Sequence, residues 1–547
     1  MAEKLFKMRI GGMSCVDCER RVARALAAAG ARVVKVSWPR GETIIGVPAE
    51  DFDFDRLTAA VAAAGYEPGP IEPLAAAEPG CPPPMSDAEY DLAIIGSGSA
   101  AFAAAIRAVE LGARVLMVER ATLGGTCVNV GCVPSKALLR AAEVFYEARR
   151  HPFAGVYTRA EGVNPAEVVA QKDELIGELR KEKYADLVDF YGWELVYGEA
   201  RFEDPDTINV NGRRVRARAY LIATGASPAV PPIPGLSEGG YLTYVEALEL
   251  KEVPDRLAII GANAVGLELG QYFQMLGSGV TFFELMPRIA PFEEPEVSAA
   301  LAEAFKARGF EILTDARVER VEGRRIHARV GNEELVREFD RVLVATGRRP
   351  NTQGLGLEAA GVEVDGRGAV LVDEYLRTTN ARVWAAGDVT GGPQFVYVAA
   401  YEGKVAAENV LAEAGRKVEL EAVPRVTFTD PQVAAVGLKE AEARQMGYDV
   451  QVGILPAKEV VRARVNRKAD GLFKLVADGR TGRLLGAHIV AEQAGEAIYA
   501  ATLGVKAGLT VEDLVNSFAP YLTMSEGLRL AALAFSRDVA RLSCCAG

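Results

Sequence analysis

Histidine is scarce in this 547-residue sequence, and long apolar or basic runs are absent from it. The three histidines, His151, His327 and His488, lie outside any recognisable catalytic motif, so we interpret each as structural. No stretch approaches the roughly 20 apolar residues of a membrane-spanning helix, and the first residues lack the apolar core of a secretion signal. The net charge of −12 without a basic block argues against nucleic-acid binding. We therefore expect a cytoplasmic protein that binds neither membrane nor nucleic acid.

Cysteine is also infrequent, but it is not scattered. Of the seven cysteines, only Cys81 stands alone. The others form three close pairs: Cys15/Cys18, Cys127/Cys132 and Cys544/Cys545. Because cytoplasmic thiols stay reduced, such pairs indicate redox or metal chemistry more than architecture. A relaxed disulfide needs α-carbons about 4.4–6.8 Å apart, so a bridge between the neighbours Cys544 and Cys545 would be strained and easily reduced.

The first 68 residues predict a small ferredoxin-like βαββαβ domain. Its segment "GGMSCVDC" places Cys15 and Cys18 on the loop that enters the first helix, where a helix N-terminus lowers thiol pKa values. Two soft sulfurs at this spacing suit a soft metal of low coordination, and a redox pair is the alternative. The stretch resembles the G-M-x-C-x-x-C signature of heavy-metal-associated domains. Residues 69–87, rich in Pro, Ala and Glu, predict a flexible linker in which Cys81 is incidental.

Two segments each predict a strand, a glycine-rich turn, a helix and a second strand. In the first, Gly96, Gly98 and Ala101 match G-x-G-x-x-A, and Glu119 ends the second strand, where it can bind ribose hydroxyls. In the second segment the corresponding positions are Gly261, Asn263, Gly266 and Glu284. Two such units imply two dinucleotides, a flavin and a nicotinamide. The asparagine at the middle position implies a slightly different approach to the pyrophosphate.

Between the two units lies "GGTCVNVGCVPSK", in which Cys127 and Cys132 are close and a proline-led helix follows. From about Tyr90 onward the chain resembles the flavin-dependent pyridine nucleotide–disulfide oxidoreductases, whose redox signature is G-G-T-C-x-N-x-G-C-x-P-S-K. The resemblance implies an α/β protein with two Rossmann-like domains and an α+β dimerisation domain, behind the ferredoxin-like metal-binding domain. The expected boundaries are 88–230 and 346–420 for the FAD-binding domain, 231–345 for the NAD(P)-binding domain and 421–547 for the dimerisation domain.

The resemblance also implies the cofactors and the electron path. FAD and NADH or NADPH are expected, with hydride passing to the flavin and electrons reaching Cys132, which opens the Cys127–Cys132 bridge. Lys136 and Glu268 match positions that pair beside the reactive edge of the flavin, and Asp388 matches the ribityl contact. Further cofactor-binding positions are Gly125, Thr126, Thr224, Gly225, Gly347 and Gly387.

The electron acceptor follows from a substitution near the end of the chain. Disulfide reductases of this family carry an acid–base histidine in H-P-T-x-S-E, whereas this chain has Tyr521 in "APYLTMSEG". A phenol titrates near pH 10 and is a poor base at neutral pH, so we expect a substrate that needs no proton shuttle. The segment and the ending "LSCCAG" resemble the family members that reduce mercuric ion. That resemblance implies a homodimer and Hg(II) bound as a thiolate complex.

In this hypothesis Hg(II) passes from Cys15/Cys18 to Cys544/Cys545 of the partner chain and then to Cys127/Cys132. Tyr184 and Tyr521 match tyrosines that flank the metal. Glu284 would repel a 2′-phosphate, which favours NADH or dual use, and Arg288 is the residue expected to compensate. Two alternatives remain: a dihydrolipoamide dehydrogenase-like disulfide reductase, and a metal-sequestering chaperone with an idle core.

Overall fold

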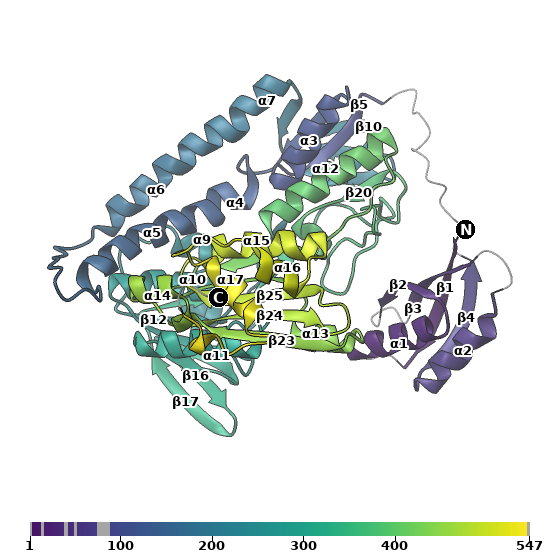
Figure 1. Cartoon of the computed structure of the whole chain (residues 1–547). Helices are drawn as coiled ribbons and strands as arrows, with labels where there is room; N and C mark the ends of the chain where they lie inside the picture. The colour runs from purple at the N-terminus through teal and green to yellow at the C-terminus, as the bar shows by residue number, and fades with distance from the viewer. Residues whose placement is uncertain (1–2, 13–15, 38–41, 49–51, 74–87, 544–547) are drawn as a thin grey trace.

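The computed structural model describes residues 3–12, 16–37, 42–48, 52–73 and 88–543 (Figure 1). Four of the cysteines lie outside these residues: Cys15, Cys81, Cys544 and Cys545. Cys18 lies in helix α1, for which the structure describes the backbone but not the side chain of this residue. The metal-binding predictions for the N-terminal pair and for the tail therefore stay predictions.

The N-terminal module has the expected ferredoxin-like fold. Its elements are β1 Glu3–Gly11, α1 Val16–Ala28, β2 Arg32–Ser37, β3 Glu42–Pro48, α2 Phe54–Ala63 and β4 Glu67–Pro73. The sheet order is β2-β3-β1-β4, and apolar residues of the two helices pack on one face of it. Met8, Val22 and Leu57 are fully buried there, so the module has a core of its own. Strand β4 continues beyond residue 68, the expected end of the module.

The first α/β domain is built around a parallel sheet. Strands β5 Tyr90–Ile95, β6 Val115–Glu119, β7 Glu194–Tyr197, β10 Arg213–Ile222 and β20 Val383–Ala385 pair in the order β7-β6-β5-β10-β20. Strand β20 joins the sheet from far along the chain. Helices α3 Ser99–Glu110 and α12 Val396–Ala412 pack against each other beside it through small side chains, chiefly alanine (Figure 1).

Several further elements belong to this domain or border it. They are α4 Gly125–Val130, α5 Cys132–Arg149, α6 Pro165–Arg180, the π-helical turn η1 Lys181–Ala185, α7 Asp186–Tyr191, β8 Ala200–Asp204, β9 Thr207–Val210, β11 Ala226–Pro228, β19 Arg348–Pro350 and the 3₁₀ turn η2 Asp388–Thr390. Helices α5 and α6 run side by side along one flank of the molecule (Figure 1). Helix α5 is thus anchored along its length, which fixes Cys132 at its first position.

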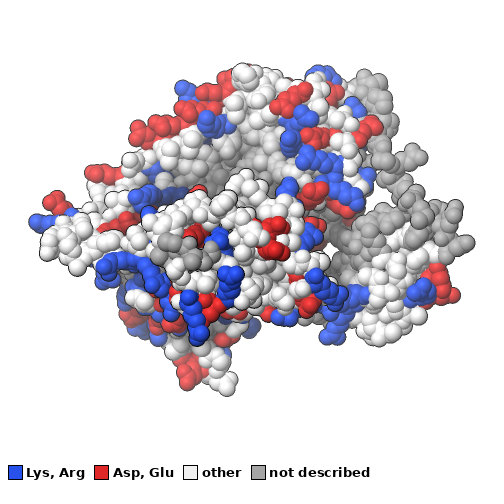
Figure 2. All heavy atoms as spheres, viewed as in Figure 1, with Lys and Arg blue, Asp and Glu red and all other residues white. Residues whose placement is uncertain are grey.

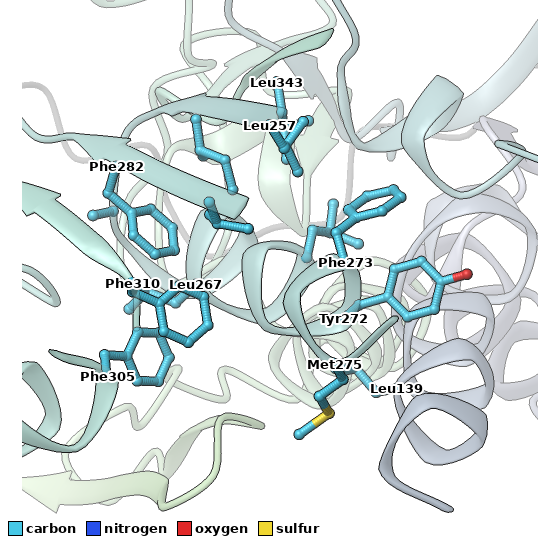
Figure 3. Close-up of a cluster of buried hydrophobic side chains, with 14 of the residues drawn as sticks. Leu139, Leu257, Leu267, Tyr272, Phe273, Met275, Phe282, Phe305, Phe310 and Leu343 are labelled. Atoms are coloured by element: carbon cyan, nitrogen blue, oxygen red, sulfur yellow. The ribbon is translucent and has the colours of Figure 1, made fainter. Parts of the chain in front are cut away.

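The second α/β domain repeats the parallel arrangement. Strands β12 Arg256–Ile260, β13 Gly279–Phe283, β14 Glu311–Leu313 and β18 Arg341–Val344 pair in the order β14-β13-β12-β18, with helices α10 Ala264–Leu276 and α11 Pro295–Ala307. An antiparallel sheet follows, made of β15 Ala316–Glu322, β16 Arg325–Val330 and β17 Glu333–Glu338. Figure 3 shows Leu139 of α5 beside Tyr272 and Met275 of α10, while Phe282 of β13 and Phe305 of α11 group with Phe310 in another part of the same cluster. Each such fully buried side chain stabilises the fold by about 1.5–3 kcal/mol, and here the packing joins the Cys132 helix to the second domain.

The C-terminal domain is an antiparallel sheet covered by helices. Strands β21 Arg425–Thr427, β22 Gln432–Gly437, β23 Val450–Pro456, β24 Leu472–Asp478 and β25 Leu484–Ala491 pair in the order β21-β22-β25-β24-β23. The helices are α13 Glu440–Gln445, α14 Val461–Asn466, α15 Ala494–Ala507, α16 Val511–Asn516 and α17 Glu526–Leu533. The buried Lys474 contacts Glu294 at 3.2 Å and Glu296 at 2.9 Å, which ties this domain to the second one.

Charges of both signs are interspersed on the visible face of the molecule (Figure 2). Within the described residues, no helix is long and apolar enough to cross a bilayer. The remaining short helices are α8 Leu236–Gly239 and α9 Tyr244–Ala247, with 3₁₀ turns η3 Ala457–Glu459 and η4 Val539–Arg541.

Candidate active site

A cavity of about 830 Å³ extends from the first glycine-rich turn to the C-terminal domain. Its wall includes Gly96 and Glu119 at one end, Cys127 and Cys132 in the middle, and Phe428 at the other end. Thirteen of the predicted cofactor and redox residues line this cavity: Gly96, Gly98, Glu119, Gly125, Thr126, Cys127, Cys132, Lys136, Thr224, Gly225, Glu268, Gly387 and Asp388. The cavity thus joins the redox cysteines to the first dinucleotide turn.

The two redox cysteines lie at consecutive helix starts. Cys127 is in the short helix α4, and Cys132 is the first residue of α5. Gly131 between them lies so close to α4 that a Cβ there would be 2.9 Å from the carbonyl oxygen of Thr126. Both thiols are free, Cys127 half-buried and Cys132 exposed to the cavity. The tight connection brings the two sulfurs together, as the motif predicts.

The two thiols have opposite acidities. The hydrogen bond from Cys127, against the opposing effect of burial and with help from the Lys136 ammonium, lowers the pKa of Cys132 to about 7. The same hydrogen bond, followed by burial, raises the pKa of Cys127 well above its ordinary value. Near neutral pH Cys132 is therefore the thiol of the pair that ionises, and Cys127 is the hydrogen-bond donor to its thiolate.

Lys136 is held beside Cys132 by two contacts. Its Nζ lies 2.6 Å from Oε2 of Glu268, a residue of α10, and 4.6 Å from the ring centroid of Phe428. Glu268 also accepts the backbone N–H of Phe428 at 2.9 Å. The predicted Lys136–Glu268 pair is thus formed, and it connects the redox helix, the second domain and the C-terminal domain at one wall of the cavity.

The first glycine-rich turn has no room for side chains. Gly96 has φ +109°, and a Cβ on it would lie 2.4 Å from the carbonyl oxygen of Ala223. A Cβ on Gly125 would lie 2.7 Å from the α-carbon of Gly98. Ser97 donates a hydrogen bond to Glu119, whose other carboxylate oxygen accepts the N–H of Ala121 at 2.7 Å. The turn therefore presents bare backbone and an oriented carboxylate to the cavity, which fits the pyrophosphate and ribose of a dinucleotide.

The second turn is built on the same plan with different details. Gly261 has φ +101°, and a Cβ on Gly266 would lie 2.1 Å from the carbonyl oxygen of Gly261. Asn263 occupies the N-cap of α10. The carboxylate of Glu284 accepts two backbone N–H groups, from Ala262 at 2.7 Å and from Met286 at 2.8 Å.

Arg288, the residue expected to compensate for Glu284, is directed elsewhere. Its Nη2 donates to the carbonyl oxygen of Pro291 at 3.2 Å, within its own loop. None of the hydrogen bonds described for Arg288 or for Glu284 joins these two residues. Glu284 is therefore the charged group that closes the second turn.

Four site residues were not predicted from the sequence, and three of them contact predicted residues. Arg348 pairs with Asp388 and donates to the carbonyl oxygen of Ala226 at 2.5 Å. Asn351 bridges to Thr224 through its backbone and side chain, at 2.7 and 2.9 Å. Phe428 lies under Lys136. The signal for the first two was the segment "ATGRRPN", in which both residues follow Gly347; the sequence offered no comparable signal for Phe428.

The two predicted tyrosines have different surroundings. Tyr184 lies in the π-helical turn η1 and packs edge-on against Phe102, with ring centroids 4.8 Å apart. Burial raises its pKa, and the charges of Cys127 and Cys132 add to this, but Tyr184 does not line the cavity. Tyr521 is 49 % exposed in the C-terminal domain and does not line the cavity of its own chain. Tyr397, which was not predicted, lines the cavity, and burial followed by the charge of Cys132 raises its pKa to about 12.

No histidine lines this cavity. His488 is fully buried in β25, where burial lowers its pKa to about 4 and its Nε2 contacts the carbonyl oxygen of Leu438 at 3.0 Å. His327 is buried beside Arg320 and Glu334 in the small antiparallel sheet, and His151 lies near Phe153. In the described part of the chain no three or more His, Cys, Asp or Glu residues gather to hold a metal. Cys127 and Cys132 are the thiols that line the cavity.

Comparison with known proteins agrees with this geometry. Residues 90–403 match the pyridine nucleotide-disulphide oxidoreductase family and residues 423–532 match its dimerisation domain. The chain belongs to this family, so FAD and a pyridine nucleotide are its cofactors, and the dimerisation domain supports a homodimer. The glycine cradle at Gly96 and Gly125 and the oriented Glu119 fit the flavin nucleotide.

Two relatives resemble the chain over its whole length. It is 50 % identical to the mercuric reductase of Staphylococcus aureus over 100 % of both chains, and 50 % identical to that of Bacillus cereus over 100 % of this chain and 87 % of the relative. Among solved structures, the Cu(II) complex of the flavoprotein disulfide reductase RclA from Escherichia coli has a TM-score of 0.72. It is 31 % identical, over 81 % of this chain and 99 % of that one.

Proposed function

We propose that this protein reduces Hg(II) to elemental mercury with electrons from NAD(P)H. The observation that carries this proposal is the pair of thiols in the cavity wall. Cys132 has a pKa of about 7 and is hydrogen-bonded to Cys127, and no histidine lines the same cavity. Full-length likeness to mercuric reductases supports the same substrate. A soft, two-coordinate cation prefers two thiolates, and this pair supplies them.

The order of bond formation follows from the acidities of the two thiols. Cys132 is the more acidic thiol, and its thiolate forms the first sulfur–mercury bond, displacing one thiolate of the incoming complex. Once Cys132 is bound to the cation, its sulfur no longer accepts the hydrogen bond from Cys127. The pKa of Cys127 therefore falls. Cys127 releases its proton and forms the second bond, displacing the other thiolate.

The surrounding residues hold this arrangement. When bound, FAD relays the two electrons of a hydride from NAD(P)H to Hg(II), which becomes Hg(0). Gly96, Gly98 and Glu119 would hold its adenosine diphosphate end, and Asp388, fixed by Arg348, would hold its ribityl chain. Lys136, fixed by Glu268, keeps positive charge beside Cys132 and so keeps that sulfur ionised.

Delivery of the ion is assigned to the other two cysteine pairs. In this proposal Cys15 and Cys18 collect Hg(II), and Cys544 and Cys545 of the partner chain pass it to the cavity. The charges of the cavity thiols add to the effect of burial in raising the pKa of Tyr184 in the same chain. Tyr521 would reach the site of the partner across the dimer, which is consistent with its exposure and its absence from the cavity of its own chain.

The decisive experiment is an anaerobic assay of volatile mercury. We expect purified FAD-loaded protein to release mercury vapour from Hg(II) in excess thiol when NADH or NADPH is added. Cys127→Ser with Cys132→Ser should abolish the release. Lipoamide as the acceptor distinguishes the disulfide-reductase alternative. We expect it to be reduced at least about a hundredfold more slowly, because Tyr521 stands where disulfide reductases of this family carry their acid–base histidine. Absence of vapour, or fast lipoamide turnover, would contradict the proposal.

The delivery step has its own test. Cys544→Ala with Cys545→Ala should lower turnover of thiol-bound Hg(II) by at least about tenfold while NAD(P)H still reduces the flavin. Cys81→Ala is the matched control, since it removes a thiol that belongs to no pair, and its turnover should equal that of the unmodified protein. Full activity of the tail variant would remove the tail from the pathway and leave the cavity chemistry unaffected.

A further inference from the structure

One buried carboxyl group beside the cavity has no part in the chemistry described so far. Glu402 lies in α12 and is 3 % exposed. Its Oε2 accepts the backbone N–H of Gly387 at 2.7 Å. Gly387 directly precedes Asp388, and both line the cavity. Glu402 therefore supports, from behind, the segment that reaches the flavin site.

Neighbouring residues place Glu402 close to the cavity wall. Ala399, one helical turn earlier on the same face of α12, lines the cavity, and a Cβ on Gly387 would lie 3.3 Å from its Cβ. The next residue, Gly403, is pressed against α3, where a Cβ would lie 2.0 Å from the carbonyl oxygen of Ala100. The carboxyl group is thus enclosed by Gly387, Ala399 and the alanine face of α3.

The charges that act on Glu402 are few. Asp388 is the ionisable neighbour, and it is paired with Arg348. The residues of α3 buried against α12 are alanines and Phe102, which carry no charge. Burial raises the pKa of Glu402 to about 7, against the hydrogen bond from Gly387 and with the charge of Asp388 adding to the effect. Glu408, six positions further along α12, differs because Arg107 and Arg416 pair with it and its pKa is lowered.

We propose that Glu402 is a positioning residue of the flavin site that also takes up a proton when electrons enter the bound flavin. The carboxyl group fixes the Gly387–Asp388 segment in either protonation state, because Oε2 can accept the N–H of Gly387 in both. Hydride transfer brings two electrons and one proton to the flavin, which adds negative charge beside Glu402. Since like charges disfavour the carboxylate, Glu402 binds one proton from solvent, and the extra charge is neutralised.

The test is the pH dependence of the flavin midpoint potential, measured in FAD-loaded protein carrying Cys127→Ser and Cys132→Ser so that the flavin is the sole redox centre. Above the pKa of Glu402 in the oxidised protein, we expect one additional proton per two electrons. That is a tenfold change in the equilibrium constant per pH unit, or about 30 mV, added to the slope of the flavin itself. Glu402→Gln keeps an acceptor for Gly387 but cannot ionise, so the additional slope should vanish. Glu408→Gln should leave it unchanged.

A second measurement does not depend on a variant. Anaerobic photoreduction of the same double-serine protein in weak buffer should take up the additional proton, seen with an indicator dye between pH 7 and 8, and uptake should fall towards pH 6. An equal slope in Glu402→Gln, or no additional uptake, would overturn the inference and leave Glu402 as a hydrogen-bond acceptor only. Because these readouts involve FAD and not mercury, failure of the proposed function would not affect them.

Discussion

The two dinucleotide units of this chain have the same strand–turn–helix arrangement, but the carboxylate at the end of the second strand is held differently in each. Both have a glycine at positive φ pressed against a carbonyl oxygen, Ala223 for Gly96 and Ala345 for Gly261. In the first unit the terminal carboxylate, Glu119, is held by a side-chain hydroxyl and one backbone N–H. In the second, Glu284 is held by two backbone N–H groups.

The surroundings of the two units differ more than the turns do. The first unit opens into a large cavity walled by the redox helix and by the Gly387–Asp388 segment. The glycines of the second turn, Gly261 and Gly266, do not line that cavity. This difference suits one cofactor that stays bound and another that must enter and leave in each cycle. The same backbone strain, introduced at the glycine turn of each unit, should therefore affect the binding of the two cofactors differently.

The largest expected effect comes from placing a methyl group at each turn. Gly96→Ala would collide with backbone at 2.4 Å and Gly261→Ala at 2.5 Å. Strain of about 3 kcal/mol corresponds to about a hundredfold in affinity. We expect Gly96→Ala to lose FAD during gel filtration, measured by absorbance. Gly261→Ala should keep its FAD and show a raised KM for the nicotinamide. Loss of FAD from both variants, or from neither, would break the comparison.

The second effect is the nicotinamide preference. Because the carboxylate of Glu284 closes the second turn and Arg288 is directed to Pro291, we expect NADH to be preferred over NADPH by about tenfold in kcat/KM. Glu284→Ala should reduce this ratio. Glu119→Ala is the matched control in the first unit, where it should weaken FAD binding without changing the ratio. A large NADPH advantage in the unmodified protein would show that another group receives the 2′-phosphate.

The same contrast shows what the sequence could reveal. The glycine spacing and the terminal acids predicted both turns, because a strand, a tight turn and a helix are local and each residue type has a local reason. Arg348 and Asp388, by contrast, come from different segments, and their pairing depends on β19 and η2 meeting at the cavity. Phe428 reaches Lys136 only because the C-terminal domain docks there. Contacts of that kind depend on packing between domains, which no local pattern encodes.

The smallest expected effect concerns the acidity of Cys132. This thiol follows the first dinucleotide unit, and the second unit has no corresponding cysteine. Because the pKa of Cys132 is about 7, alkylation of the reduced protein by iodoacetamide should rise with pH through this value as the thiolate forms. Lys136→Met removes the second favourable influence but keeps the hydrogen bond from Cys127. We therefore expect the midpoint to move upward and the rate at pH 7 to fall about threefold. Lys404→Met, on α12, is the control and should leave the profile unchanged. Peptide mapping should locate the label on Cys132, and an unaltered midpoint in Lys136→Met would mean that the thiol pair sets its own acidity without the lysine.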